Sequence, residues 1–283
     1  MKIKITSDST CDLSQALVQA NDIGICPLVV NKGGKAFHDG VDISPDDIYD
    51  HVAKGGSLCS TSALNPQDYL EFFEKYLGEY DAVIHLNISS DFSSCYQNAC
   101  LAAAELENVY VVDSRNLSTG HGLVVLEAVK LANAGLEPRE IVEKLQEMTG
   151  RVRASFILDQ LEYMKKGGRC SSVAVLGANL LSLKPCIEVK NGKMGVAPQK
   201  FRGSLGKCLK NYVDQQLNNL EALEKDRIFV THSGVEESIV NAVVEQVKEK
   251  GYFTEVTVTR AGCTVSCHCG PGTLGVLFVE KKV

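Results

Sequence analysis

The sequence predicts an α/β protein of two domains, a parallel-sheet α/β/α domain followed by a smaller α+β domain with a mixed sheet. Three observations predict this. The chain has 283 residues, more than one hydrophobic core usually spans. In the first half, short apolar runs alternate with helical patterns, which is typical of βαβ units. In the second half, Asn191-Gly192 lies between two short runs and indicates a β-hairpin. We place the N-terminal domain at residues 1–157 and the C-terminal domain at residues 158–283.

The first half carries the patterns of four strands and three long helices. The runs expected to form strands are residues 2–6, 25–30, 82–88 and 109–112. A helix is expected after Asn65-Pro66, because aromatic side chains follow at helical spacing: Tyr69, Phe72, Phe73 and Tyr76. Two further amphipathic helices are expected within residues 123–134 and 141–148.

The second half is expected to contain a hairpin, a long helix and several strands. Residues 227–251 are typical of a strand, a loop and a long helix, which ends at Gly251. Residues 253–270 are expected to be one or two strands, and residues 272–283 a last strand.

Three cysteines and a histidine within CTVSCHC, residues 263–269, raise the question of a metal site. Zinc ligands must converge on one point. In an extended strand the three cysteines would share one face, and His268 would lie on the other face beside two hydroxyls. No Cys-x-x-Cys pair occurs elsewhere in the chain to complete a set of four ligands. We therefore expect no metal here, and His268 on a polar surface of the strand.

Charge and composition argue against nucleic acids and membranes as binding partners. The formal net charge is -6 and no cluster of Lys and Arg stands out, so nucleic-acid binding is not expected. No apolar run is long enough to span a bilayer, and the first residues lack the apolar core of a signal peptide. We expect a cytoplasmic protein with at most transient membrane contact, whose 11 cysteines stay reduced.

Hydroxyl side chains gather in polar segments near the ends of the predicted strands. These segments are SDST (7–10), CSTS (59–62), SSDFSS (89–94) and DSRNLST (113–119). In an open parallel sheet, ligands bind outside the carboxyl ends of the strands, and helix N-termini there favour anions. Thr61 and Ser93 have more neighbouring hydroxyls than the capping of one helix requires. No Arg or Lys is seen to converge on them, so a carboxylate or single phosphate suits the site better than a triphosphate.

Known enzyme motifs are missing from the sequence. It has no Walker A loop and no G-x-S-x-G nucleophile elbow. A Ser/His-dependent hydrolase or phosphotransferase acting on a small acyl substrate is nevertheless an alternative. It would need Ser93 or Thr61 to meet His268, His121 or His232, and no spacing in the sequence demands that they meet.

Motifs along the whole chain resemble those of the DegV family. In order they are SDSTCDL, TS at 61–62, SSDFSSCYQNA, VVDSRNLSTGHG, LEYMKKGGRCS, LKP and HCGPGTLG. The resemblance implies a long-chain fatty acid, such as palmitate or oleate, between the two domains. The N-terminal domain would hold its head group, and the C-terminal domain would close over its acyl chain.

The resemblance also implies a role without catalysis and without a cofactor. The protein would be a lipid-binding subunit in fatty acid metabolism and transport, presenting the acyl carboxylate to a separate fatty acid kinase subunit that makes acyl-phosphate. A regulatory module that senses acyl chains without passing them on is a further alternative. Copurification with a kinase subunit would separate the two.

The resemblance places the fatty-acid-binding residues at Thr61, Ser62, Ser93 and His268. One departure affects them, because SSCY at 93–96 replaces the usual Ser-Gly-Thr-Tyr. Ser94 would be costly if the backbone there needed a positive φ.

Arg202 matches a basic position of the family. It lies near the pocket mouth, on the partner surface, or simply in solvent, and the sequence does not choose among these.

Overall fold

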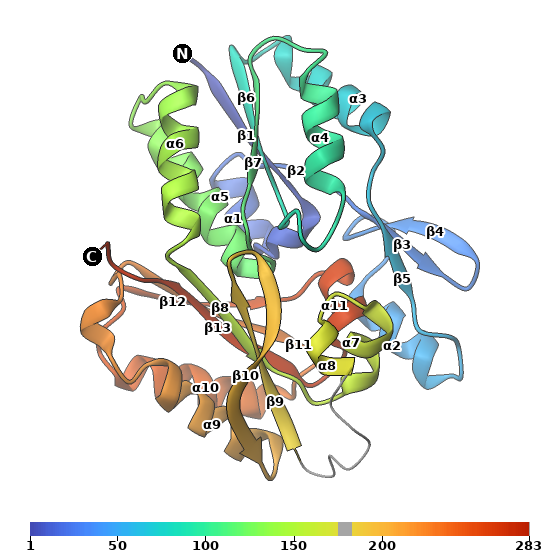
Figure 1. Ribbon diagram of the computed structural model, residues 1–283, viewed down its shortest axis with the longest axis vertical. Helices are drawn as coiled ribbons and strands as arrows, with labels where there is room; N and C mark the ends of the chain where they lie inside the picture. Colours follow the sequence, from blue (N-terminus) through green and yellow to red (C-terminus); the bar gives the residue numbers. More distant parts are fainter. Residues whose placement is uncertain (175–182, 283) are drawn as a thin grey trace.

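A computed structural model of the protein describes residues 1–174 and 183–282. Figure 1 shows two sheets, one above the other, with helices outside and between them. The upper sheet is parallel and the lower sheet is mixed, so the predicted α/β architecture is confirmed. Helix α5 (Ser118–Asn133) contacts strands of both sheets, and its first eight residues are all buried.

The upper sheet has four strands in the order β2-β1-β6-β7. In that order their bounds are Gly24–Cys26, Ile3–Asp8, Ala82–Asn87 and Val109–Asp113. Strand β6 is buried at every residue, as expected of a central strand covered on both faces. One face is covered by α3 (Pro66–Leu77) and α4 (Cys95–Ala103), and the other by α5 and α6 (Pro138–Thr149). The short η1 (Ser9–Cys11) and α1 (Gln15–Ala20) follow β1.

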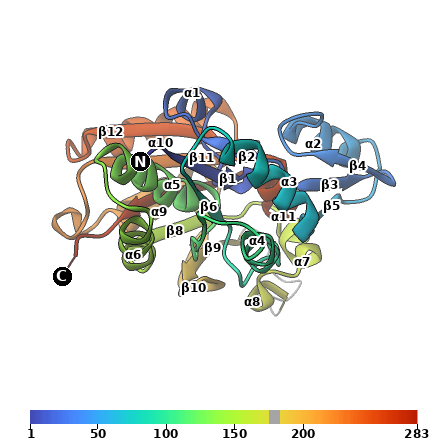
Figure 2. The same cartoon turned by 90° about the horizontal axis from the view of Figure 1, so that it is seen from above.

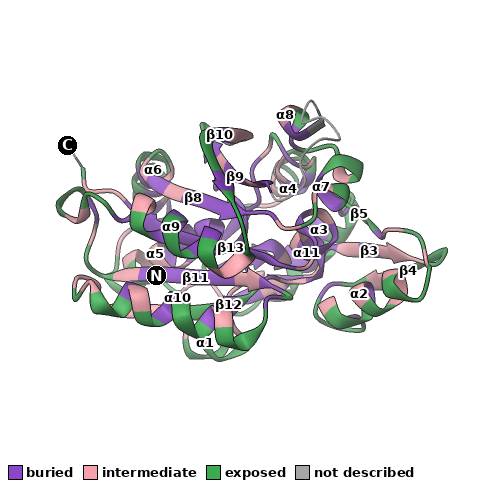
Figure 3. Ribbon diagram, turned by 90° about the horizontal axis from the view of Figure 1, so that it is seen from below, coloured by how far each residue is buried: buried purple, intermediate pink, exposed green. Residues whose placement is uncertain are grey.

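The lower sheet has six strands in the order β10-β9-β8-β13-β11-β12, all antiparallel except β11 and β12. In that order their bounds are Lys193–Arg202, Leu183–Lys190, Val152–Ile157, Thr273–Val279, Arg227–Ser233 and Glu255–Arg260. Helices α9 (Leu205–Gln216) and α10 (Glu237–Glu249) pack on this sheet, with η2 (Leu220–Ala222) between them in sequence. Figure 3 shows the outer sides of both helices exposed over buried strands.

Strands β9 and β10 form the predicted hairpin. Lys190 pairs with Lys193, so Asn191 and Gly192 are the two turn residues. Their φ angles are 50° and 79°, and two positive values are what a type I′ turn requires. The turn also joins the two sheets, because Ser89 Oγ donates to the Gly192 carbonyl at 2.8 Å.

A third, antiparallel sheet projects from the side of the molecule (Figure 2). It contains β4 (Lys35–His38), β3 (Val29–Lys32) and β5 (Ser60–Ser62), with helix α2 (Pro45–Ala53) beside them. The prediction of one strand at residues 25–30 is wrong. The segment divides into β2 and β3 in different sheets, and Pro27 between them has no N–H to continue a ladder. Residues 60–62 were expected in a loop and instead pair with β3.

Three short helices fill the corner between this projecting sheet and the two main sheets. They are α7 (Leu161–Gly167), α8 (Ser171–Ala174) and α11 (Cys263–Cys269). The chain passes from the upper to the lower sheet between β7 and β8, and the domain boundary at residue 157 stays a prediction. In the two described ranges no helix is long and apolar enough to cross a membrane.

Candidate functional site

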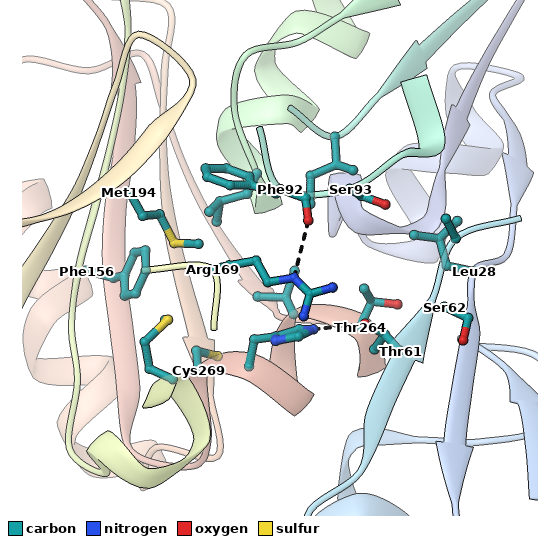
Figure 4. Close-up of a pocket in the computed structure, with 16 residues that line it drawn as sticks. Leu28, Thr61, Ser62, Phe92, Ser93, Phe156, Arg169, Met194, Thr264 and Cys269 are labelled. Atoms are coloured by element: carbon teal, nitrogen blue, oxygen red, sulfur yellow. Dashed lines mark hydrogen bonds between the residues drawn. The ribbon is translucent and has the colours of Figure 1, made fainter. Parts of the chain in front are cut away.

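A cavity of about 70 Å³ lies where the upper sheet, the lower sheet and the projecting sheet meet (Figure 4). All four residues predicted to bind the ligand line it: Thr61, Ser62, Ser93 and His268. The other polar lining residues are Arg169 and Thr264. The remaining lining is Leu28, Ala63, Ile88, Phe92, Leu117, Phe156, Met164, Met194, Val265 and Cys269.

The polar end of this cavity is its outer end. Ser62 and Arg169 are exposed, and Thr61, Ser93 and His268 are partly buried. By contrast, the aromatic rings of Phe92 and Phe156 are buried. A ligand with a polar head and an apolar body would therefore place its head toward the solvent.

Thr61 and His268 form the polar centre of the site. Thr61 Oγ1 lies 2.8 Å from His268 Nε2, although the two residues are 207 positions apart in the chain. Burial, and to a lesser extent the nearby Arg169 cation, lower the pKa of His268 to about 4, so the imidazole is neutral at pH 7. His268 Nδ1 is buried and has no hydrogen-bond partner within the described ranges. We assign the proton to Nε2, because an N–H at Nδ1 would have no acceptor. Thr61 then accepts from His268, and its own hydroxyl proton is free for a ligand.

The segment that carries His268 is a helix, so the predicted strand at 263–269 is wrong. The side chains of two distant aspartates explain the difference. Asp39 accepts from the N–H groups of Cys263 at 2.7 Å and Thr264 at 2.9 Å, and Asp12 accepts from that of Gly262 at 2.8 Å. These are N–H groups that the first turn of a helix leaves without partners, and the two side chains supply the missing acceptors.

The helix divides the three cysteines, which a strand would have placed on one face: Cys269 lines the cavity with His268, and the other two do not. Cys263 and Cys267 are four residues apart and pack with Cys59 in a buried apolar cluster. Thr264 and His268, also four residues apart, both line the cavity. Among residues 1–174 and 183–282, no three His, Cys, Asp or Glu side chains gather as metal ligands would.

Ser93 begins the turn before α4. Its Oγ accepts from the Cys95 N–H at 3.3 Å and donates to Cys95 Sγ at 3.0 Å. Burial raises the pKa of Cys95 to about 11, so it is a neutral thiol, and sulfur is a weak acceptor. Ser94 has a φ of -77°, which any residue adopts. The departure from the family pattern at Ser94 therefore introduces no backbone strain.

Arg169 lines the cavity together with Thr61 and Ser93, and the sequence analysis did not place it there. The expectation that no Arg or Lys side chain reaches Thr61 and Ser93 is therefore wrong. Its Nε donates to the Phe92 carbonyl at 3.3 Å, and one Nη donates to the Gly167 carbonyl at 2.6 Å. Figure 4 shows the guanidinium reaching into the space beside Thr61. Gly168, with a φ of 70°, ends α7 and turns the chain back toward the cavity. The Gly-Gly-Arg sequence after two lysines was the available signal.

No described histidine completes a hydrolase triad at the cavity. Ser93 bonds Cys95 and not His268, and His268 Nδ1 has no carboxylate to orient it. His121 lies 3.2 Å from Ser7 and 3.8 Å from Asp8, but all three side chains are fully buried and line neither cavity described in this section. This arrangement gives the hydrolase alternative no support.

A second cavity of about 30 Å³ adjoins the first. Four residues line both and form the wall between them: Leu117, Phe156, Val265 and Cys269. His232 faces this second cavity and does not line the first. Arg202 is exposed at the end of β10 and lines neither cavity.

The fold and the cavity define an α/β protein with two main sheets and an apolar cavity at their junction, polar at its outer end. The chain belongs to the DegV family: the family model described as "Uncharacterised protein, DegV family" matches residues 2–281. A DegV domain-containing protein of Caldanaerobacter subterraneus is 31% identical, over 99% of each chain.

Two solved structures are similar over nearly the whole chain. The first, described as fatty acid binding of a DegV family protein from Thermus thermophilus, is 31% identical with a TM-score of 0.92, covering 99% of this chain and 100% of that one. The second, a stearic acid-binding protein from Eubacterium ventriosum, is 26% identical with a TM-score of 0.85, covering 99% and 98%.

Proposed function

We propose that this protein binds one long-chain fatty acid, such as palmitate or oleate, and presents its carboxylate to a separate kinase subunit that makes acyl-phosphate. The protein itself performs no chemistry in this proposal. One observation carries it: Thr61, Ser93, His268 and Arg169 meet at the outer end of a cavity whose deeper lining is apolar. Similarity to DegV proteins described as fatty-acid-binding supports the same ligand class.

The head group is held by donors that hydrogen bonds within the protein already orient. Thr61 accepts from His268 and so has its own proton to donate, and Ser93 can exchange its weak bond to Cys95 Sγ for one to a carboxylate. With His268 neutral, Arg169 supplies the positive charge. Because Arg169 and Ser62 are exposed, the carboxylate remains accessible to a second protein.

The acyl chain supplies most of the affinity. Each buried methylene contributes about 0.8 kcal/mol, so a C16 chain offers on the order of 11 kcal/mol before ordering and association costs. A hydrogen bond to a charged group adds only about 1.5–3 kcal/mol. Deleting a hydroxyl should therefore affect the orientation of the head group more than the retention of the chain.

The acyl chain needs more room than the two cavities provide in this structure. A cavity of roughly 150 Å³ takes up a molecule as small as benzene. The cavities of about 70 and 30 Å³ are smaller than this even when taken together, so the chain requires displacement of the wall between them and further repacking of the lining. Met164 and Met194 line the larger cavity and have flexible side chains suited to such repacking.

Native mass spectrometry of the protein purified from a bacterial host, followed by denaturing extraction and lipid analysis, tests the proposal. We expect a bound C14–C18 fatty acid at about one per chain. A protein that is free of lipid, and whose mass does not shift after incubation with palmitate or oleate, would refute it. Assays of the isolated protein with acyl esters and acyl phosphates test the absence of catalysis, since turnover would favour the Ser/His alternative.

A further inference from the structure

One hydroxyl at the cavity differs from the others. Thr61 is bonded to His268, Ser62 Oγ accepts from Asn31 at 3.0 Å, and Ser93 is bonded to Cys95. Thr264 Oγ1 is buried and has no hydrogen-bond partner in the described part of the chain. The residue is only 6% exposed, and it lines the cavity.

Thr264 is held in place by its backbone, and its side chain takes no part in these hydrogen bonds. Its N–H donates to Asp39, and the preceding residue, Cys263, donates its N–H to the same carboxylate. A helical Thr or Ser often bonds a carbonyl of the preceding turn. Ser266, two residues further on, has partners: its Oγ donates at 3.2 Å to the carbonyl of Ala261, just before the helix, and lies 2.9 Å from Ser233 Oγ. Thr264 forms no such bond, so its hydroxyl is available to a ligand in the cavity.

We propose that Thr264 binds the head group, as a further donor to the carboxylate beside Thr61 and Ser93. The assignment rests on the proposed function, because it names a residue of that same site. Thr264 and His268 are four residues apart and share one face of α11, which brings the free hydroxyl to the polar end of the cavity. An ionised carboxylate can accept about four hydrogen bonds, more than the predicted residues alone supply.

This role makes Thr264 a determinant of specificity. A buried donor forms its strongest hydrogen bond with an ionised acceptor, and its hydrogen bond to a neutral lipid head group is weaker. The residue would thus favour the free fatty acid over an alcohol or an ester with the same chain. Apolar contacts along the chain would be the same for both ligands and would not discriminate.

The test compares palmitate with 1-hexadecanol on Thr264→Val, which replaces the hydroxyl with a methyl group of similar size. Dissociation constants are measured by competition with a fluorescent fatty acid at pH 8, where palmitate is ionised. We expect the variant to bind palmitate about tenfold more weakly, a change of about 1.4 kcal/mol. Its affinity for 1-hexadecanol should change less than twofold. Thr264→Ser, which keeps the hydroxyl, should bind palmitate within twofold of the wild type.

Ser266→Ala is the matched control, because it removes a hydroxyl from the same helix at a position that does not line the cavity. It should leave the ratio of the two affinities unchanged. An equal loss of both ligands in Thr264→Val would show a packing role and overturn the assignment, as would no loss of palmitate. A wild-type protein that binds neither ligand would overturn the proposed function itself, and this assignment with it.

Discussion

Substituting Gly167 by Ala should weaken the proposed head-group site, although Gly167 does not line the cavity. A Cβ at this position would lie 2.4 Å from His268 Nδ1, whereas ordinary contacts begin at 3.4 Å. The imidazole would have to move by about 1 Å. It cannot retreat along its Nδ1–Nε2 direction, because Thr61 Oγ1 lies 2.8 Å beyond Nε2. The ring must therefore rotate, and the hydrogen bond to Thr61 is lost.

The expected size of the effect follows from that one bond. A neutral hydrogen bond contributes about 0.5–1.5 kcal/mol, so palmitate should bind roughly two- to tenfold more weakly. Replacing a helical Gly by Ala stabilises a helix by up to about 1 kcal/mol, so the melting temperature should fall little or not at all. The loss would thus be one of binding rather than of folding.

Calorimetric titration with palmitate gives the affinity, and the ¹⁵N shifts of the His268 ring report the bond to Thr61. Gly168→Ala is the control. Gly168 has a φ of +70°, so the change strains the turn, but no atom lies within 4 Å of the added Cβ. Unchanged affinity and unchanged ¹⁵N shifts in Gly167→Ala would refute the reasoning. An equal loss of affinity in Gly168→Ala would show that loosening of the turn, and not the contact with His268, is responsible.

Three further predictions concern the remaining parts of the site. Thr61→Ala and Ser93→Ala should lower the rate of acyl-phosphate formation with a cognate kinase subunit far more than they lower palmitate retention, and normal rates in both would contradict the head-group assignment. Arg169→Met should weaken palmitate binding several-fold at low salt and less at 0.5 M salt, because the cation is exposed and screened; a loss independent of salt would exclude a charge effect. The pKa of His268 falls from 6.5 to about 4 on folding. Between these pH values the unfolded chain therefore binds more protons than the folded chain. The free energy of unfolding should thus decrease as the pH falls from 6.5 to 4. That decrease should be smaller in His268→Gln, as urea denaturation at several pH values would show, and an identical pH dependence in both proteins would contradict it.

The parts of the fold that were predicted correctly depend on local signals. The helix after Asn65 has a capping box with Asp68 and a buried aromatic face, and the hairpin has its two positive φ angles at Asn191 and Gly192. These features are determined within a few residues, so the pattern of side chains is enough to identify them.

The parts that were missed depend on contacts from far along the chain. Residues 263–269 contain Thr and Val, which favour strands. The helix begins there because Asp39 and Asp12 accept hydrogen bonds from Cys263 and Gly262. These partners are 224 and 250 positions apart in the sequence, so no local pattern reveals them. Arg169 reaches the cavity only because a positive φ at Gly168 redirects the chain. Thr61, Ser93 and His268 do line one cavity, and their roles in binding stay predictions.

The position of β13 in the lower sheet affects how the protein is made. This strand is the last in the sequence, yet it lies between β8 and β11 and pairs with both. During synthesis, β8 and β11 leave the ribosome with the edges that will face β13 still unpaired, and such edges invite association with other chains. His268 emerges only a few residues before β13, and its helix is anchored by Asp12 and Asp39, which were made long before. The cavity therefore cannot be complete in a nascent chain until the helix that carries His268 has been made and has reached these two aspartates.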